Sequence, residues 1–539
     1  QLHRSENQNG GEIIMNHNLN NIPVEKLKFV QKNDIYHDSK FETKPVSYFQ
    51  GAFKRFCKNK GAVVAAIVIT VLVLFAILGP AFTPFQPKYY DMVYAFVTPR
   101  AEFFVDRDID FWDGSKVKNT NEVGYLKDLA LQQETGREII KRGEYEVSED
   151  GSTYSYRYDT YAGVGFGKYK IISVEEWNDI QRYQNETGRQ VLYPIVKFKD
   201  RPTLEKNKYD ANVYYQVENV KASTLRPKLD KEGNIIPNYW KYEAADFSSL
   251  MAEYNSLRIE GENGIQENGK QYFYVYGRMV DGGIEVRAEY YEYYIYQHNV
   301  VKQDGITEPV FWFGTTETGK DIFACLAYGA RFSFVFATLV AMANFIFGVI
   351  WGSISGYCGG KVDLAMERFA EILGSVPTMI VITLLKYHMG STSQALVLFI
   401  AFFATGWIGM AGTTRMQFYR FKNQEYVLVA RTLGARDRRI MFKHIFPNAI
   451  GTLITSSVLV IPSVIFSETS LSYLGIINLS TGSMTSVGTL LATGQNYLFT
   501  YPHMILWPSL FISLLMLSFN LFGNGLRDAF NPSLRGTEE

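Results

Sequence analysis

The sequence predicts a polytopic α-helical membrane protein with six transmembrane helices and an inserted α+β extracytoplasmic domain. Three observations support this prediction: strongly apolar segments in both flanks of the chain, a polar tyrosine-rich stretch between them, and loops that differ in Lys and Arg content. The mean hydropathy of −0.08 and the net charge of zero average over these regions and, alone, would describe a soluble protein. Balanced charge gives no argument for a nucleic-acid partner, and we expect none.

The first transmembrane helix is predicted at Gly61–Phe82, an uncharged run that meets the length needed to cross a bilayer. Four basic residues precede it and keep the N-terminus in the cytoplasm by the positive-inside rule: Lys54, Arg55, Lys58 and Lys60. A cleaved signal peptide is the rival interpretation, but the run is too long and no small-residue cleavage site follows. We therefore assign residues 1–60 to a cytoplasmic arm and 61–85 to the first transmembrane helix.

The letters GGEII directly before Met15 could be encoded by a purine-rich run resembling a ribosome-binding site. We hypothesise that translation starts at Met15 and that residues 1–14 are upstream read-in. The DNA upstream of the gene tests this hypothesis.

Residues 86–307 form the predicted insert, which carries most of the 36 tyrosines and none of the three cysteines. Aromatic alternation in YSYRYDTY, QYFYVYGRMV and VRAEYYEYYIYQ is typical of strands. The segments EEWNDIQRYQNETG and ADFSSLMAEYNSLR are predicted helices. The tyrosines are interpreted either as cross-strand packing or as a peptide-docking surface. Cysteine positions predict neither disulfides nor a metal site.

Apolar runs return after Arg331 and predict five more spans: Phe332–Tyr357, Phe369–Tyr387, Ala395–Met410, Ile450–Phe466 and Met504–Phe522. Eight Lys and Arg residues lie between the fourth and fifth spans, whereas the loop HMGSTSQ has none. This asymmetry places both termini in the cytoplasm. Residues 308–530 are thus a membrane core and residues 531–539 a cytoplasmic tail.

The segment 423–447 is too charged to span a membrane, yet it has helical spacing. Gly434 predicts a helix break, Ala435–Asp437 turn into a second short helix, and Pro447 marks the start of the fifth span. Such a knob would fit a groove on a cytoplasmic partner and transmit rigid-body motion. A solvated basic loop is the alternative, but it would not need the apolar face that we expect from Tyr426, Val427, Val429 and Leu433.

This segment resembles the coupling segment of ABC-importer permeases, in which E-A-A, a glycine and I-x-L-P recur at fixed spacing. Ala430, Gly434 and Pro447 match the pattern, while Leu428 stands where it has Glu, and Glu425 is the expected substitute. The resemblance implies that the ATPase-coupling residues include Glu425, Tyr426, Ala430, Arg431, Gly434, Ala435, Asp437 and Pro447.

Further segments resemble the C-type permease subunit of oligopeptide and dipeptide ABC importers. These segments are FKRFCKNKGAVVAAIVI, FTPFQP, FGTTETGKDIFACLAYGARFS, GYCGGKVDLAMERFAEIL, SETSLSYLGI and SFNLFGNGLRDAFNPSLRG. The resemblance leaves the insert unmatched and implies a type I ABC importer permease fold in a bacterial plasma membrane. Its implied partners are a homologous B-type permease subunit, two ATPase subunits, an extracellular substrate-binding lipoprotein, a peptide substrate and membrane lipid. It implies no cofactor on this chain, because ATP and Mg would bind the ATPases, and so no enzyme activity of its own.

Two acidic residues match the family pattern and are candidates for a pathway or a structural role: Glu371 and Glu468. Interfacial placement is the alternative for both. Pro377, Pro462 and Pro508 fall within predicted spans and are candidate kinks. The letters GTTETGKD nearly form a phosphate-binding loop, but Asp321 replaces the hydroxyl that would ligate Mg²⁺.

The alternatives to oligopeptide import are the import of dipeptides or nickel chelates, a membrane-anchored receptor and an intramembrane protease. We find no set of catalytic residues that supports the protease. The insert could dock the binding protein, shield the outer vestibule or contact the partner's loops. Docking is preferred, and deletion of residues 88–307 followed by a capture assay tests it.

Overall fold

The computed structural model describes residues 48–530 except for short internal stretches. The residues not described are 1–47, 108, 165–167, 194–214, 222–223, 237–264, 268–269, 273–276, 305, 307, 391, 480–484 and 531–539. Met15, the predicted helix ADFSSLMAEYNSLR and the tail 531–539 therefore lie outside the described residues. The chain divides into Gln1–Gly51 and a compact unit Ala52–Glu539, which holds every element below apart from the start of α1.

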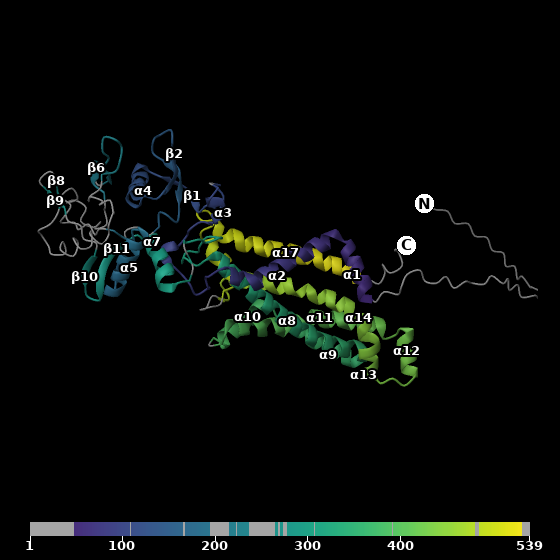
Figure 1. The fold of residues 1–539 in the computed structure, drawn as a ribbon. Helices are drawn as coiled ribbons and strands as arrows, with labels where there is room; N and C mark the ends of the chain where they lie inside the picture. The colour runs from purple at the N-terminus through teal and green to yellow at the C-terminus, as the bar shows by residue number, and fades with distance from the viewer. Residues whose placement is uncertain are drawn as a thin grey trace, which may run out of the picture. The chain divides into compact units, whose positions relative to one another are not determined.

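Five helices among the described residues are long and apolar enough to cross a membrane (Figure 1). They are α2 (Lys60–Phe82), α8 (Ile322–Cys358), α11 (Gln394–Phe421), the continuous helix Asp437–Tyr473 and α17 (His503–Phe530). The prediction of a polytopic helical protein is confirmed. The count is five, or six if the bent pair below is one span.

The predicted third span, Phe369–Tyr387, is not one straight helix. It is divided into α9 (Gly360–Gly374) and α10 (Thr378–His388), which are bent by 72° relative to each other. Pro377 directly precedes α10 and has no backbone N–H to continue the helix, which explains the position of the break. Pro508 lies inside α17, which continues through it.

Glycines let α8 and α11 pack with their backbones in close approach. A Cβ atom on Gly348, Gly352 or Gly356 would lie 2.7, 2.2 or 2.8 Å from a carbonyl oxygen of α11. The three glycines are four residues apart and so share one face of α8. Small residues at this spacing are a common basis for helix association in membranes.

Two helices were missed by sequence reasoning. The helix α1 (Tyr48–Lys58) precedes the first span within residues 1–60, which we assigned to a cytoplasmic arm, and α16 (Val487–Gln495) lies between the last two spans. A capping box formed by Ser486 and Thr489 starts α16. This pairing is a local signal that the sequence offered.

The insert contains both helices and strands. One sheet has the order β1-β3-β2, a second has β10-β11-β4 with β5 paired to β11, and two hairpins are β6-β7 and β8-β9. The strands are β1 (Ser115–Thr120), β2 (Ile140–Val147), β3 (Tyr154–Asp159), β4 (Lys168–Ile172), β5 (Leu192–Tyr193), β6 (Val217–Lys221), β7 (Thr224–Pro227), β8 (Ile265–Glu267), β9 (Lys270–Tyr272), β10 (Gly277–Val280) and β11 (Gly283–Ala288). The helices are α3 (Glu102–Val105), α4 (Glu122–Thr135), α5 (Val174–Thr187) and α7 (Tyr290–Tyr296), with the short η3 (Met92–Tyr94) and η6 (Gln297–Lys302). The helix expected in EEWNDIQRYQNETG is confirmed as α5.

The segment VRAEYYEYYIYQ is only partly the strand predicted for it. The strand β11 ends at Ala288, and Glu289 then caps α7 by accepting a hydrogen bond from the amide of Glu292. Arg137 forms ion pairs with both Glu289 and Glu292. Residues three apart share a side only in a helix, so these contacts favour the helical conformation over aromatic alternation.

Tyrosines in the described part of the insert pack against one another. The ring centroids of Tyr125 and Tyr154 are 5.1 Å apart, and those of Tyr145 and Tyr154 are 5.8 Å apart across β2 and β3. Tyr94 and Tyr161 are fully buried in a second cluster. These contacts agree with the packing interpretation of the tyrosines, while docking of a peptide stays a prediction.

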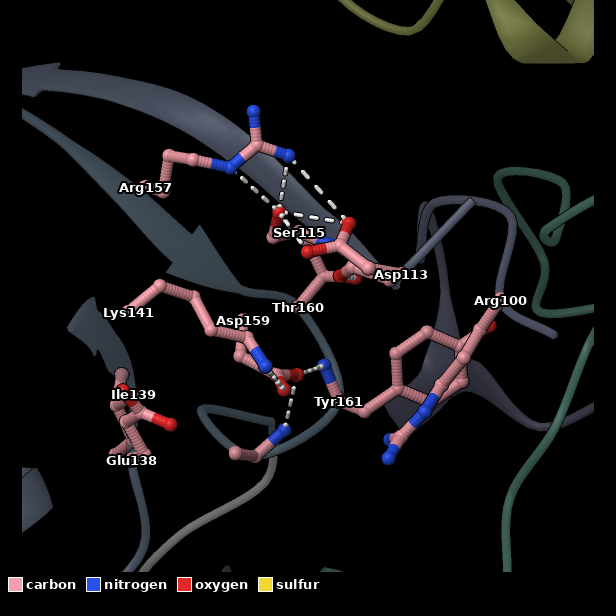
Figure 2. A network of polar contacts seen from close by, with 12 residues as sticks. Arg100, Asp113, Ser115, Glu138, Ile139, Lys141, Arg157, Asp159, Thr160 and Tyr161 are labelled. Carbon is pink, nitrogen blue, oxygen red and sulfur yellow. Dashed lines mark hydrogen bonds and ion pairs between the residues drawn. The ribbon is translucent and has the colours of Figure 1, made fainter. Parts of the chain in front are cut away.

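A polar network joins the start of β1 to the end of β3 (Figure 2). The Ser115 hydroxyl accepts a hydrogen bond from Nε of Arg157 at 3.0 Å and donates to Asp113 Oδ2 at 2.7 Å. Asp159 accepts from the backbone amides of Tyr161 and Ala162 at 2.8 and 2.9 Å. The network therefore fixes the loop directly after Trp112.

Two aromatic residues with left-handed backbones join the insert to the last spanning helix and the loop before it. Phe96 (φ 61°) stacks on Tyr501, with centroids 4.5 Å apart, and Trp112 (φ 65°) stacks on Trp507 at 5.0 Å. A positive φ is costly for bulky side chains, so the stacking energy offsets local backbone strain. The insert is thus held against this end of the helical bundle.

The near phosphate-binding motif is part of the same junction. The amide of Thr315 donates to Val97 O at 3.0 Å, and the amide of Val97 donates to Thr315 Oγ1 at 3.0 Å. Asp321 caps α8 by accepting from the amides of Phe323 and Ala324. These contacts explain the motif as a structural connection.

Candidate functional site

The segment 423–447 folds into the predicted helix–turn–helix, which we call the knob. Its first helix is α12 (Glu425–Thr432), and Gly434 follows with φ 81°. The amide of Ala435 donates to Ala430 O, and that of Gly434 donates to Arg431 O, both at 3.0 Å. This pair of bonds is a Schellman motif, which requires a left-handed residue at Gly434. The predicted helix break is confirmed.

The second half of the knob differs from the prediction of a separate short helix. The helix α13 (Asp437–Arg439) continues through a π-helical turn, η7 (Ile440–Ile445), into α14 (Phe446–Val458) and α15 (Val460–Tyr473). Pro447 is at the start of α14 and cannot donate the next intrahelical bond. A π-turn just before it accommodates the missing donor without ending the helix.

The four apolar residues expected on one face of the knob lie on two faces. Val427 is fully buried together with Ile440 and Ile445, so α12 packs against η7. Tyr426, Val429 and Leu433 are exposed, Leu433 at 82%. The exposed residues are spaced by three and four along α12 and so form one outward stripe. This outward stripe is the surface available to a partner.

Polar contacts connect the knob to the spanning helices. The Tyr357 hydroxyl, at the end of α8, donates to Asp437 Oδ1 at 2.5 Å. Asn448 Nδ2 donates to the Tyr426 hydroxyl at 3.3 Å. Partial burial raises the pKa of Tyr426, although the Asn448 contact opposes that shift, so this phenol stays neutral. Glu425 and Arg431 are exposed on α12.

A buried carboxylate lies close to the same end of the bundle and was missed by sequence reasoning. Asp363 of α9 accepts hydrogen bonds from Ser355 of α8 and from Arg415 and Tyr419 of α11. Charges inside helical membrane segments are usually paired, as here. An Asp in α9 and an Arg in α11 were visible in the sequence, but their separation of 52 residues concealed the pair.

The structure places Glu371 and Glu468 apart. Glu371 is exposed and pairs with Arg368 at 2.6 Å within α9. Glu468 is fully buried and accepts hydrogen bonds from Ser333 of α8 at 2.9 Å and from Ser472 at 3.1 Å. Its contacts connect two spanning helices.

A cavity of about 410 Å³, lined more by apolar than by polar side chains, lies between α8, α10, α11 and α15. Its polar lining is neutral and consists of Asn344, Thr378, Thr405, Ser463, Ser467 and Ser470. Within the described part of the chain, Oδ1 of Asn344 is buried without a hydrogen-bond partner. Ser463, Ser467 and Ser470 follow helical spacing within an apolar span, which is a signal that sequence reasoning could have used.

Comparison with known proteins places these features in a family. The model for a binding-protein-dependent transport system inner membrane component matches residues 348–536, and that for the N-terminal transmembrane domain of oligopeptide transport permease C matches residues 47–99. The oligopeptide transport system permease protein OppC of Bacillus subtilis is 41% identical over 237 residues, or 44% of this chain and 76% of the relative. The chain belongs to the C-type permease family of oligopeptide and dipeptide transport systems.

A second relative of this C-type permease is the dipeptide transport system permease protein DppC of Bacillus subtilis. It is 39% identical over 250 residues, which cover 44% of this chain and 75% of the relative. A chain of an inward-facing structure of the MetNI methionine ABC transporter matches with a TM-score of 0.31 at 15% identity, over 38% of this chain and 96% of that chain. Membership in the family confirms the interpretation as a multi-pass permease and does not favour the anchored receptor.

Proposed function

We propose that this C-type permease forms half of the translocation path of an ABC importer for oligopeptides and couples that path to partner ATPases. The observation that carries the proposal is the 41% identity to an oligopeptide transport permease. The knob supports it, because a permease without ATPase partners would not need an exposed apolar stripe on a rigid turn. Dipeptides and nickel chelates are the second choice of substrate.

The proposed assembly contains a homologous B-type permease, two ATPase subunits and an extracellular substrate-binding lipoprotein. ATP and Mg belong to the ATPases, and this chain carries neither. Both termini and the knob face the cytoplasm, in agreement with the basic residues around the knob, and residues 86–307 are extracytoplasmic.

The cavity between α8, α10, α11 and α15, with its neutral polar groups, is the proposed section of the path. Hydroxyl and amide groups facing lipid would be costly, whereas they suit a water-filled or partner-covered surface. Because the polar lining lacks charged residues, it offers hydrogen bonds to the peptide backbone without selecting side-chain charge.

Coupling would proceed from the outward stripe of the knob to the path. An ATPase groove that holds Tyr426, Val429 and Leu433 moves α12, and the buried contact of Val427 with Ile440 carries that motion into the fifth span. The hydrogen bond between Tyr357 and Asp437 carries it into α8. Both helices line the cavity.

The experiment is peptide uptake and ATPase activity of the purified complex in proteoliposomes, with Gly434→Pro and Gly434→Asn as a matched pair. Proline fixes φ near −65° and is incompatible with the φ of 81°, whereas asparagine tolerates the left-handed region. We expect Gly434→Pro to abolish uptake while the subunit stays inserted, and Gly434→Asn to retain most uptake. Normal uptake by the proline variant would refute the coupling role, and uptake of another solute class by the unaltered complex would refute the substrate.

A further inference from the structure

An aromatic arm, residues 103–112, joins α3 to the loop before β1 and is described except for residue 108. Its rings pack against one another: the Phe103 and Phe104 centroids are 5.3 Å apart, and those of Phe104 and Trp112 are 5.8 Å apart. Phe103 and Phe111 are nevertheless 57% and 62% exposed. Exposed aromatic clusters of this kind mark contact with a partner or a membrane.

Contacts between α2 and α17 indicate how deep the arm lies relative to the membrane. Trp112 stacks on Trp507, and Phe511, one turn further along α17, contacts Phe75 of α2. Since α2 and α17 are antiparallel neighbours, Trp507 is level with about the last turn of α2, roughly 5 Å before this helix ends at Phe82. Trp112 therefore lies at the level where an uncharged spanning helix leaves the hydrocarbon core.

The arm is two-sided. Glu102 and Asp106 line a hollow of about 620 Å³ together with Arg189, which follows α5. Phe103 and Arg107 lie on another side, where the Arg107 guanidinium is 3.9 Å from the centre of the Phe103 ring. Asp110 pairs with Arg142 of the insert at 3.1 Å.

This separation of acidic side chains from the exposed aromatic face fits the membrane–water interface. Among the described acidic residues, Glu102 and Asp106 line the hollow and Asp110 pairs with Arg142, while an aromatic face with an arginine beside it is left uncovered. Trp is enriched at the headgroup level of membranes, Phe inserts on the apolar side of segments that lie in the interface, and arginine extends from there to the phosphates. The same arrangement is typical of segments that lie in the plane of the interface.

The position on the bundle favours lipid over the partner permease as the occupant. The cavity proposed for the path is lined by residues of α8, α10, α11 and α15. The arm instead packs on α17, whose neighbour α2 exposes Ile77, Leu78 and Phe82. An apolar helix face of this kind suits acyl chains.

We propose that the described residues of this arm, 103–107 and 109–112, form a membrane-interface anchor, in which Phe103, Phe111 and Arg107 bind phospholipid in the leaflet on the insert side. The insert is then fixed by lipid as well as by its stacking on α17. This proposal is independent of which solute the permease transports.

The test uses the whole transporter in lipid nanodiscs and site-directed spin labelling. The exposed cysteines Cys57 and Cys358 are changed to Ser, while Cys325 is buried and stays. A nitroxide is then placed at Phe103→Cys or Phe111→Cys. Leu78→Cys on α2 is the lipid-exposed control, and Ile171→Cys, 60% exposed in β4, is the control on the insert.

Collision with oxygen, which partitions into lipid, is compared with collision with a water-soluble nickel chelate. We expect the oxygen-to-nickel ratio at Phe103 and Phe111 to be several-fold above that at Ile171 and close to that at Leu78. A ratio equal to that at Ile171 would overturn the proposal. Low collision with both reagents would also overturn it, because a protein partner would then cover the arm. Thermal unfolding of each labelled protein shows that the label has not disrupted the fold.

Discussion

Arg415 of α11 donates two hydrogen bonds to Asp363 of α9, from Nε to Oδ1 at 2.6 Å and from Nη2 to Oδ2 at 2.7 Å. Ser355 and Tyr419 donate to the same carboxylate, so three helices meet on one buried charge. Charge-assisted, bidentate hydrogen bonds of this kind are among the strongest hydrogen bonds in proteins.

The variant Asp363→Asn removes the negative charge from this junction. We expect a loss of about 2 kcal/mol in the free energy of unfolding, because Arg415 loses its counter-charge and the amide keeps only one of the two acceptor oxygens. Thermal unfolding of the complex in nanodiscs measures this loss of stability. The control is Glu371→Gln, which breaks an exposed pair on the same helix and should cost at most about 0.5 kcal/mol. Equal effects of the two variants would contradict the prediction.

The variant Gly352→Ala tests the close packing of α8 on α11. The new Cβ would lie 2.2 Å from Ala411 O, so the two backbones must separate. We expect destabilisation of about 1–3 kcal/mol, the range for overpacking. Gly409→Ala in α11 is the matched control, because its Cβ meets no described atom within 4 Å. If both alanines are tolerated equally, the glycine contact is not what holds the helices together.

The variant Gly406→Ala tests the cavity as part of the path. Its Cβ would lie 2.4 Å from Nδ2 of Asn344 and displace this amide. We expect peptide uptake to fall several-fold while the unfolding temperature changes little. Gly412→Ala, with open space around the new Cβ, serves as the control in the same helix. Uptake unaffected by Gly406→Ala would argue against a role of Asn344 in the path.

Glu289 makes the stability of the insert depend on pH. Burial raises its pKa from 4.5 to about 7, although the charge of Arg137 opposes the shift. A carboxyl with a raised folded-state pKa contributes stability that is full below about pH 4.5 and lost as the pH rises through about 7. The loss is at most about 3 kcal/mol for this group.

The variant Glu289→Gln removes that titration. Between pH 4.5 and 7.5 we expect the unfolding temperature of the variant to fall less with rising pH than that of the wild type. Glu146→Gln, at an exposed position in β2, should leave the wild-type slope unchanged. Parallel pH profiles for wild type and Glu289→Gln would show that Glu289 does not titrate in this range.

Much of the membrane fold follows from local sequence signals. Uncharged runs identify α2 and α17, and Gly434 identifies the end of α12, because length, charge and left-handed glycine act within one element. The break at Pro377 was marked by the proline, but the 72° bend depends on packing against α11.

Contacts between segments far apart in the sequence could not be predicted from local signals. Asp363 and Arg415 are separated by 52 residues, and Trp112 is separated from Trp507 by most of the chain. No periodicity connects such pairs, since only the folded topology brings them together. The helix α7 was mistaken for a strand because Arg137, which holds Glu289 and Glu292, lies in another segment.

The knob includes the first residues of the continuous helix Asp437–Tyr473, so a movement of the knob would tilt this helix. Its 37 residues are about 55 Å long. A tilt of about 5° around the knob end would move the far end sideways by about 5 Å, roughly the spacing of two hydrogen-bonded strands. The serines at 463, 467 and 470 sit near that far end, where the displacement is largest. In the proposed coupling, a small movement of the knob would thereby produce a larger displacement beside the cavity.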